Sequence, residues 1–396
     1  MKKDMLFVID SLNCAGAEKS LISLLTILDY SKFNVDLMLF GHEGILQGLV
    51  PKEVNILTPL KYTEFTKMNL KKAVIYSLKK KKVNMLTSRI NYSIKIRKQK
   101  YSHAEEARLF WESAGKVIEK RTKVYDIAIS YAQGIPTFYV AEKVKSKKKY
   151  AWVNVSYRLN DKEKGFQKKF YDQFNKIVAV SPSAKEIFLE TFPCYSNNVE
   201  VIYDINNSRF IFEMANLGEA YEDDFDGLRI LTIGRLAHQK GYDIALAACK
   251  KLKEKGIHFR WYALGIGPLY SEINEYIIKN ELSEHFILLG IKVNPYPFIK
   301  SSDIYVQTSK FEGFGLAIAE ARMLNKPIVT TRFDAVFNQM IDRKNGLVVD
   351  MNADAVCDGI LKLIGDEELT KSITQFLSNE KKGNIEEIEK FYHLIG

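Results

Sequence analysis

The sequence lacks the features that would place it across a membrane or around a structural metal. It has no unbroken apolar run of about 18 residues, so we expect no membrane-spanning helix. Its four cysteines lie far apart, without a C-x-x-C pair or a histidine at ligand spacing. This spacing argues against a zinc site and favours the reduced thiols of a cytosolic protein. The first apolar run, residues 5–9, stops at Asp10, which is too early for a signal peptide and predicts a strand.

Length and composition describe a globular protein of more than one domain. With 396 residues the chain is too long to fold around a single hydrophobic core, so we expect two domains of roughly 200 residues each. The hydrophobic content of 46% and the charged content of 27% are typical of folded globular chains.

Positive charge is concentrated in residues 61–100. This window has thirteen Lys and Arg residues against one acid, Glu64, so its net charge is +12. The whole chain has a net charge of +10, so the remaining residues together carry about −2. Tyrosines and aliphatic residues are interleaved with the basic ones. An anionic bilayer attracts such a segment by roughly 1 kcal/mol per basic residue, so we expect a possible membrane contact here. No nucleic-acid-binding module is recognisable, and we expect no nucleic-acid partner. A solvated basic helix or a mobile loop is the alternative.

Short β-branched runs alternate with amphipathic helices in two successive series. The expected strands are residues 5–9, 35–40, 54–57, 125–130, 149–155 and 176–180, then 228–233, 259–264, 286–289, 304–307, 327–330 and 347–349. Helices between parallel strands make a doubly wound sheet, so the two series predict two Rossmann-like domains. Polar and acidic residues collect over residues 202–226, where we place the boundary.

The stretch FEGFGLAIAEA, residues 311–321, is the strongest candidate for a binding site. Glu312 and Glu320 flank a turn in which Gly313 and Gly315 let the backbone approach a ligand closely. The turn leads into a helix, whose first N–H groups and positive dipole end suit a phosphate. The alternative is an ordinary helix start with solvated carboxylates.

Three other loops follow predicted strands and add weaker signals. GRLAHQKG carries Arg235 and Lys240, which are placed to neutralise a diphosphate unless both are merely solvated. LGIGPL carries Gly265 and Gly267, and a lone G-x-G is weak evidence. In SLNCAGAEKSL, Gly16 offers a close approach to a helix start, although packing is the commoner reason for such a glycine. Because ligands bind at the carboxyl ends of parallel strands, loops of one sheet can converge on one site.

The order of these motifs resembles family 4 of the retaining glycosyltransferases. GRLAHQKG, LGIGP, NPYPFIKSSDIYVQTSKFEGFGLAIAEA and a Gly346-containing turn before LVV resemble that family's donor half, and AGAEKSL and KIVAVSPSAK resemble its other half. The most specific part is the Glu, seven residues, Glu signature around Gly-Phe-Gly-Leu. The resemblance covers nearly the whole chain apart from the basic insertion.

The resemblance implies a GT-B fold, in which two Rossmann-like domains face each other across a cleft. It implies an acceptor-binding domain over residues 1–203 with the basic insertion at about 61–103, and a nucleotide-sugar domain over residues 204–375. The last segment, residues 376–396, would then hold a helix that returns to the first domain. Apolar residues within 385–395 suit such a helix.

The resemblance also implies a role for each site residue. Arg235 and Lys240 would bind the donor diphosphate, Glu312 the hydroxyls of the donor sugar, and Glu320 the ribose. The remaining donor-binding candidates are Gly16, Gly265, Gly267, Ile291, Gly313, Phe314, Gly315 and Leu316. The implied activity is transfer of a sugar from a nucleotide diphosphate sugar to a glycan acceptor, in cell-surface polysaccharide or glycoconjugate synthesis. The basic segment is the reason to expect an acceptor that is lipid-linked at the inner membrane face. Cations and helix-start amides would stabilise the departing diphosphate, so we expect no metal and no cofactor.

Asn154 departs from the pattern of the family, which often has a histidine at the corresponding acceptor-side position. An asparagine side chain can donate and accept hydrogen bonds, but it cannot relay a proton near neutral pH. A catalytically silent subunit that stabilises a partner transferase therefore remains an alternative. A GT-B nucleotide-sugar epimerase is a second alternative, and the two glutamates and the Gly-Phe-Gly-Leu turn argue against it. The D-x-D sequence of Asp224 and Asp226 lies in an acidic linker, and we expect it to be a solvated loop rather than a metal site.

Overall fold

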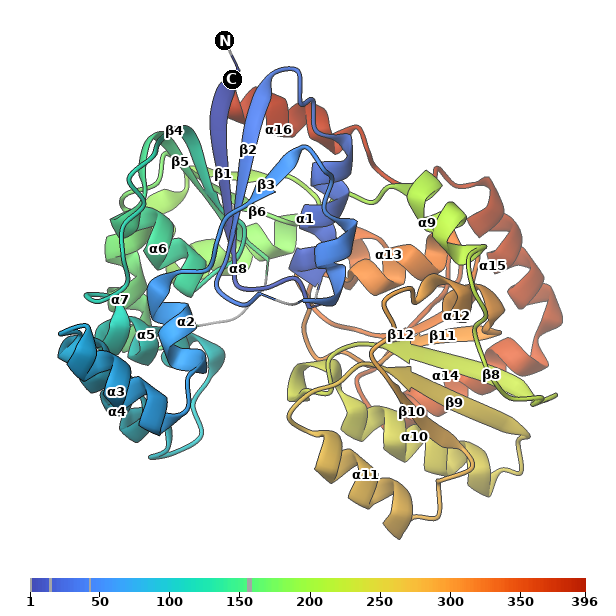
Figure 1. The fold of residues 1–396 in the computed structure, drawn as a ribbon. Helices are drawn as coiled ribbons and strands as arrows, with labels where there is room; N and C mark the ends of the chain where they lie inside the picture. The colour runs from blue at the N-terminus through green and yellow to red at the C-terminus, as the bar shows by residue number, and fades with distance from the viewer. Residues whose placement is uncertain (1, 14–15, 43, 155–158) are drawn as a thin grey trace. The chain divides into compact units, whose positions relative to one another are not determined.

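The computed structural model describes residues 2–13, 16–42, 44–154 and 159–396 (Figure 1). These residues form two compact units. Unit 1 is Met1–Tyr203 together with Ile388–Gly396, and unit 2 is Asp204–Glu387. Each unit is an α/β domain built on one parallel sheet. None of the described helices is both long enough and apolar enough to cross a bilayer.

Unit 1 contains a seven-stranded parallel sheet in the order β3-β2-β1-β4-β5-β6-β7. Its strands are β1 (Lys3–Ile9), β2 (Phe33–Leu39), β3 (Val54–Ile56), β4 (Val124–Ser130), β5 (Lys145–Val153), β6 (Lys176–Ala179) and β7 (Val199–Val201). The edge strand β7, which is three residues long and pairs with β6, was not predicted. β5 begins four residues before its predicted start, since pairing with β4 extends it through a lysine-rich segment. Val155, at its predicted end, lies outside the described residues.

Helices cover both faces of this sheet, with α1 and α6 on opposite sides (Figure 1). Apart from the basic insertion and the C-terminal helix, the helices of unit 1 are α1 (Gly16–Ile27), η1 (Ile45–Leu49), α5 (His103–Ala114), α6 (Ile135–Lys143), α7 (Asp161–Tyr171), α8 (Pro182–Thr191) and η2 (Pro193–Tyr195). A capping box of Ser102 and Glu105 starts α5. The C-cap of the helix is Gly115, where a Cβ would lie 2.6 Å from the Trp111 carbonyl oxygen.

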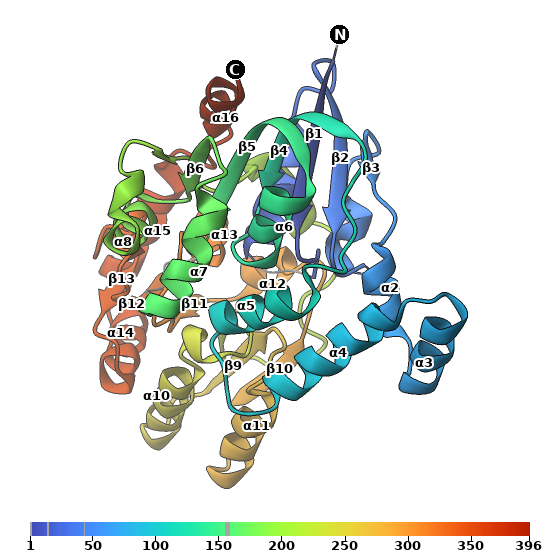
Figure 2. The ribbon, with the colours of Figure 1, turned by 90° about the vertical axis from the view of Figure 1, so that its left-hand side faces the viewer.

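The basic insertion is helical. It forms α2 (Lys61–Lys67), α3 (Leu70–Lys79) and α4 (Val83–Ile96), which extend from unit 1 (Figure 2). Phe110 of α5 anchors the insertion, because its ring lies 6.3 Å from that of Tyr62 and 5.4 Å from that of Tyr92. Of the two structural alternatives left open by the sequence, a helix and a loop, the helix is correct.

The C-terminal helix α16 (Glu387–Ile395) completes unit 1 beside β1 and β2 (Figure 1). Phe391 is fully buried, with ring centroids 6.3 Å from Phe7 and 6.0 Å from Trp152. The Tyr150 hydroxyl donates to the Leu394 carbonyl at 2.9 Å. The predicted start of this segment, residue 376, was too early. It falls inside α15 (Glu367–Asn379), whose buried residues belong to the core of unit 2.

Unit 2 contains a six-stranded parallel sheet in the order β10-β9-β8-β11-β12-β13. Its strands are β8 (Leu228–Ile233), β9 (Phe259–Leu264), β10 (Phe286–Gly290), β11 (Ile304–Gln307), β12 (Ile328–Thr331) and β13 (Leu347–Val349). Its helices are α9 (Ser208–Ala215), η3 (His238–Lys240), α10 (Tyr242–Glu254), α11 (Tyr270–Lys279), α12 (Tyr296–Ser301), α13 (Leu316–Met323), η4 (Val336–Asn338), α14 (Ala353–Gly365) and α15. Counted within the unit, the order is 3-2-1-4-5-6, so the chain reverses its direction of travel across the sheet between β8 and β11. Ligands bind at such a switch point in open α/β sheets.

Candidate functional site

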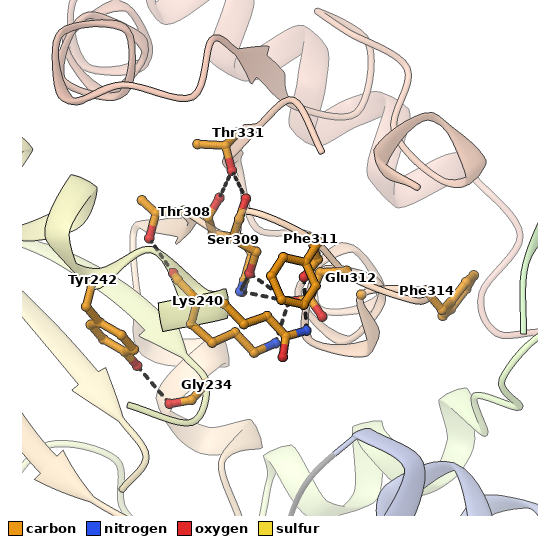
Figure 3. Close-up of polar contacts among 12 residues, drawn as sticks. Gly234, Lys240, Tyr242, Thr308, Ser309, Phe311, Glu312, Phe314 and Thr331 are labelled. Atoms are coloured by element: carbon orange, nitrogen blue, oxygen red, sulfur yellow. Dashed lines mark hydrogen bonds and ion pairs between the residues drawn. The ribbon is translucent and has the colours of Figure 1, made fainter. Parts of the chain in front are cut away.

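An ion pair joins the carboxyl ends of the two strands at this switch point. Lys240 follows β8 and Glu312 follows β11, and the two strands are paired neighbours. The Lys240 ammonium donates to Glu312 Oε1 (Figure 3). The side chains are 20% and 9% exposed, so the pair is shielded from solvent but remains partly accessible. The structure thus brings together Lys240 and Glu312, two of the residues predicted to contact the donor.

Backbone contacts hold the two loops in this position. The Thr308 hydroxyl donates to the Lys240 carbonyl at 2.9 Å, and Lys310 N–H donates to the Gln239 carbonyl at 2.8 Å. Gly241 makes this approach possible. Its φ is +63°, and a Cβ there would lie 2.0 Å from the Thr308 carbonyl oxygen.

The Gly-Phe-Gly turn starts α13 as predicted. Gly315 is left-handed, with φ +84°, and its carbonyl accepts the first helical bond from Ile318 N–H at 3.0 Å. The amides at the first positions of a helix have no intrahelical acceptor, so they are available to an anion. The Gln339 side chain donates to the Phe314 and Gly315 carbonyls and so fixes the turn. Gln339 was not predicted, because it lies 24 residues beyond Gly315 and outside any recognised motif.

Glu320, the second carboxylate of the signature, is almost fully buried on α13. It is 2% exposed and accepts a hydrogen bond from the Tyr296 hydroxyl at 3.1 Å. Tyr296, on α12, was also missed, because nothing in NPYPF distinguishes it from a core aromatic. The predicted contact of Glu320 with ribose remains a prediction.

The remaining donor-side candidates serve the loops in different ways. Arg235 is exposed, and within the described ranges its guanidinium has no hydrogen bond or ion pair. A Cβ on Gly265 would lie 2.0 Å from the Gly234 carbonyl oxygen, and one on Gly267 would lie 2.3 Å from that of Leu236. These two glycines therefore allow the loops after β8 and β9 to pack together. Ile291 is half-buried just beyond the end of β10.

On unit 1, Asn154 follows β5 and is bound to the neighbouring strand end. Its Nδ2 donates to the Tyr131 carbonyl at 2.7 Å, so the amide bridges the ends of β4 and β5. Its Oδ1 is buried and accepts no hydrogen bond from the described residues. Gly16 is the exposed first residue of α1. Cys14 and Ala15 of the predicted first loop lie outside the described residues.

Unit 2 is similar in sequence to known glycosyltransferases. Residues 220–379 match the model of the glycosyl transferases group 1. An uncharacterized glycosyltransferase of Methanocaldococcus jannaschii is 32% identical over 203 residues, 50% of this chain and 52% of that protein. N-acetylgalactosamine-N,N'-diacetylbacillosaminyl-diphospho-undecaprenol 4-alpha-N-acetylgalactosaminyltransferase of Campylobacter jejuni is 26% identical over 204 residues, 51% of this chain and 54% of that protein. The chain spans about half the length of these curated relatives.

The whole chain has the GT-B fold. Its structure is similar to a crystal structure of S. aureus TarM in complex with UDP, fondaparinux and alpha-GlcNAc-glycerol. The TM-score is 0.67 at 15% sequence identity, and the match covers 100% of both chains. At this identity the likeness establishes the fold, and it agrees with the two Rossmann-like units predicted from the sequence.

The first loop of this GT-B protein contains a carboxyl group with unusual acidity. Burial and, to a lesser extent, the Glu18 carboxylate raise the pKa of Asp10 to about 7. Ser11 donates to Glu18 at 2.5 Å. Asp10 directly follows β1, at the switch point of unit 1. From the sequence alone, Asp10 was expected only to end a strand.

Metal-binding groups do not gather in the described part of the GT-B chain. No cluster of three or more His, Cys, Asp or Glu side chains that could hold an ion occurs among those residues. Asp226 of the D-x-D sequence is 91% exposed and pairs with His258 at 3.0 Å. This agrees with the expectation of a solvated loop. Of the described cysteines, Cys194, Cys249 and Cys357 are unpaired.

The close approach at Gly241 makes a stability prediction with a matched control. Gly256 also has a positive φ, +70°, but a Cβ there would meet nothing within 4 Å. We expect Gly256→Ala to destabilise unit 2 by about 1 kcal/mol through left-handed strain alone. Gly241→Ala should cost about 1–3 kcal/mol more, because the methyl group forces the Lys240 loop away from Thr308. Urea unfolding measures both, and equal losses would show that the loops have room to separate.

The acidity of Asp10 predicts a pH dependence of stability. Between about pH 4 and pH 7 the folded chain keeps a proton on Asp10 that the unfolded chain has released, so the stability should fall as pH rises. Asp10→Asn removes this dependence. We expect the free energy of unfolding of the variant, relative to the wild type, to increase from pH 5 to 7 and level off above about 7.5. A difference independent of pH, measured by urea unfolding, would contradict the assignment.

Proposed function

We propose that this chain is a retaining glycosyltransferase that transfers a sugar from a nucleotide diphosphate sugar to a glycan acceptor. The observation that carries the proposal is the ion pair of Lys240 and Glu312 at the switch point of unit 2, beside the N-terminus of α13. The match of unit 2 to group 1 glycosyl transferases and the GT-B fold support it.

The site chemistry suits the departure of a diphosphate. Negative charge grows on the leaving group as the glycosidic bond breaks, and positive groups aimed at that charge lower the barrier. Lys240, the exposed Arg235 and the first amides of α13 would supply this stabilisation without a metal ion. Glu312 would accept hydrogen bonds from hydroxyls of the donor sugar.

Asn154 limits how the acceptor hydroxyl can lose its proton. One N–H of its Nδ2 donates to the Tyr131 carbonyl, and an amide does not titrate near neutral pH. The departing phosphate oxygen, which becomes more basic as the bond breaks, would take the proton instead. This scheme needs no histidine at position 154.

We propose that the acceptor is a lipid-linked glycan of cell-surface polysaccharide or glycoconjugate synthesis. The Campylobacter jejuni relative is named for an acceptor linked to diphospho-undecaprenol, and the TarM structure contains UDP and carbohydrate. The chain would then act in the cytoplasm, at the inner face of the membrane.

The exposed apolar side chains of the insertion support this location. On α3, Leu70, Val74 and Leu78 recur every four residues and are 63%, 37% and 68% exposed. On α4, Ile90 and Ile94 are 43% and 58% exposed. Each set lies on one side of its helix. The insertion is anchored by other residues, so these side chains are left for the apolar part of an interface.

The surrounding charge favours an anionic bilayer as the partner. The turn between α3 and α4 carries four consecutive exposed lysines, residues 79–82. Lysines beside exposed aliphatic groups are typical of surfaces that bind anionic lipid headgroups while the aliphatic groups enter the interface.

The catalytic proposal is tested with Glu312→Gln. A thermal-shift screen of nucleotide sugars first identifies the donor, which should raise the melting temperature of the wild type. Loss of the carboxylate should then reduce transfer by about 10²- to 10³-fold. Glu275→Gln, an exposed change on α11 of the same unit, should leave transfer unchanged. Transfer by Glu312→Gln at the wild-type rate would refute the site.

The same assay separates the alternatives. Conversion of the donor in the absence of any acceptor would indicate a nucleotide-sugar epimerase. A chain that neither transfers nor hydrolyses any donor, but restores activity to a partner enzyme, would be a silent subunit.

The membrane proposal is tested by co-sedimentation with vesicles. We expect binding to phosphatidylglycerol vesicles, weaker binding to phosphatidylcholine vesicles, and a decrease with salt. Changing Lys79, Lys80, Lys81 and Lys82 to Gln should weaken binding to the anionic vesicles at least tenfold. The matched control changes Lys162, Lys164, Lys168 and Lys169 of α7 to Gln, which removes the same charge elsewhere on unit 1. Equal losses for both variants, or equal binding to both lipids, would refute the insertion as the membrane contact.

A further inference from the structure

Polar side chains alternate along β11 and beyond its end on one face. Tyr305, Gln307 and Ser309 are two residues apart, so they project to the same side of the extended chain. Ile304 and Val306 project to the other side, into the hydrophobic core of unit 2. The three polar side chains are at most 1% exposed. A buried polar row of this kind needs internal partners.

These side chains form a chain of hydrogen bonds that ends on Glu312. The Tyr305 hydroxyl donates to Gln307 Oε1 at 2.5 Å, which directs the amide nitrogen of Gln307 the other way. That nitrogen donates to Ser309 Oγ at 2.6 Å, and Ser309 Oγ donates to Glu312 Oε1 at 2.6 Å. Each donor therefore points toward the carboxylate. Figure 3 shows Ser309 and Glu312 at this end of the chain.

All these contacts reach one oxygen of Glu312. Lys240 and Ser309 donate to Oε1, and Gln307 Nε2 makes a longer contact with it at 3.4 Å. In the part of the chain that the structure describes, no group donates to Oε2. Glu312 is still 8% exposed. The carboxylate is thus held by one oxygen while the other is unoccupied.

We propose that Ser309 and Gln307 are positioning residues that hold Glu312 through Oε1 and so reserve Oε2 for hydroxyls of the donor sugar. The inference rests on the proposed function and assigns to two further residues the orientation of its central carboxylate. A carboxylate whose rotation is already restricted loses less entropy when it binds a hydroxyl. The same arrangement leaves the other N–H bonds of Lys240 for the diphosphate, so Lys240 need not release Glu312 when the donor binds.

A purely structural role for the row would stabilise unit 2 without affecting recognition of the sugar. A structural role and a positioning role predict different effects on the affinities for nucleoside diphosphate and for nucleotide sugar. Nucleoside diphosphate lacks the sugar, so its affinity should not depend on the orientation of Glu312. Nucleotide sugar includes the hydroxyls that Glu312 would hold, so its affinity should depend on that orientation.

The experiment measures dissociation constants of the donor and of its nucleoside diphosphate by calorimetry for Ser309→Ala, Ser309→Thr and Gln307→Leu. We expect Ser309→Ala to weaken nucleotide-sugar binding about tenfold while changing nucleoside diphosphate binding less than twofold, since one hydrogen bond to a charged group is lost. Ser309→Thr retains the hydroxyl and should restore most of the affinity. The double variant of Ser309→Ala and Gln307→Leu should be no weaker than Ser309→Ala alone, because Gln307 acts through Ser309.

Ser302→Ala is the matched control. Ser302 is also buried, at 1% exposure, and its hydroxyl donates to the Ile299 carbonyl at 2.9 Å rather than to Glu312. It should lower the melting temperature without changing the ratio of the two dissociation constants.

The outcomes separate this inference from the proposed function. If the wild type binds no nucleotide sugar, the proposed function fails. If the wild type binds one and Ser309→Ala weakens both ligands equally, or weakens neither, the positioning role is refuted and the function is not. If Ser309→Ala does not fold, the ratio of the two dissociation constants is measured for Gln307→Leu instead and interpreted in the same way.

Discussion

The ion pair of Lys240 and Glu312 is the interaction on which the candidate site of unit 2 depends. Its members are 72 residues apart in sequence and meet only because β8 and β11 are neighbours in the sheet. A shielded carboxylate and ammonium lose hydration, and such a pair is favourable only when its geometry and its remaining hydrogen bonds are good. Here Ser309 supports the carboxylate, and Thr308 fixes the backbone of Lys240. A ligand with phosphate and hydroxyl groups would therefore meet charges that are already oriented.

The sequence predicted the strands of unit 2 well, because a parallel sheet covered on both faces needs continuous apolar runs. β8, β9, β11 and β13 have the bounds expected from those runs. The sequence was less informative where tertiary contacts decide the structure. β7 is three residues long and exists because it pairs with β6. The early start of β5 depends on pairing with β4, which local composition does not reveal.

Within the site, the sequence identified charged residues and glycines but not the groups that orient them. Lys240 and Glu312 could be selected because a charged residue that follows a predicted strand can be recognised from the sequence alone. Gln339, Tyr296 and Gln307 contact the signature, but nothing in the sequence around them marks them as part of a site. Gly265 and Gly267 were selected as ligand contacts, and the structure shows that their immediate role is to let two loops touch. A glycine pattern alone does not distinguish approach to a ligand from approach to a neighbouring loop.

The position of α16 has a consequence for the order in which the protein can be assembled during translation. Residues 388–396 belong to unit 1, but they are synthesised after the whole of unit 2, residues 204–387. The sheet of unit 1 can pair as soon as β7 has left the ribosome, yet Phe7 and Trp152 lack the ring of Phe391 until the last residues emerge. Until then this part of the unit 1 core remains uncovered. Folding of the first unit is thus completed only after the second unit has been made, although the first unit begins the chain.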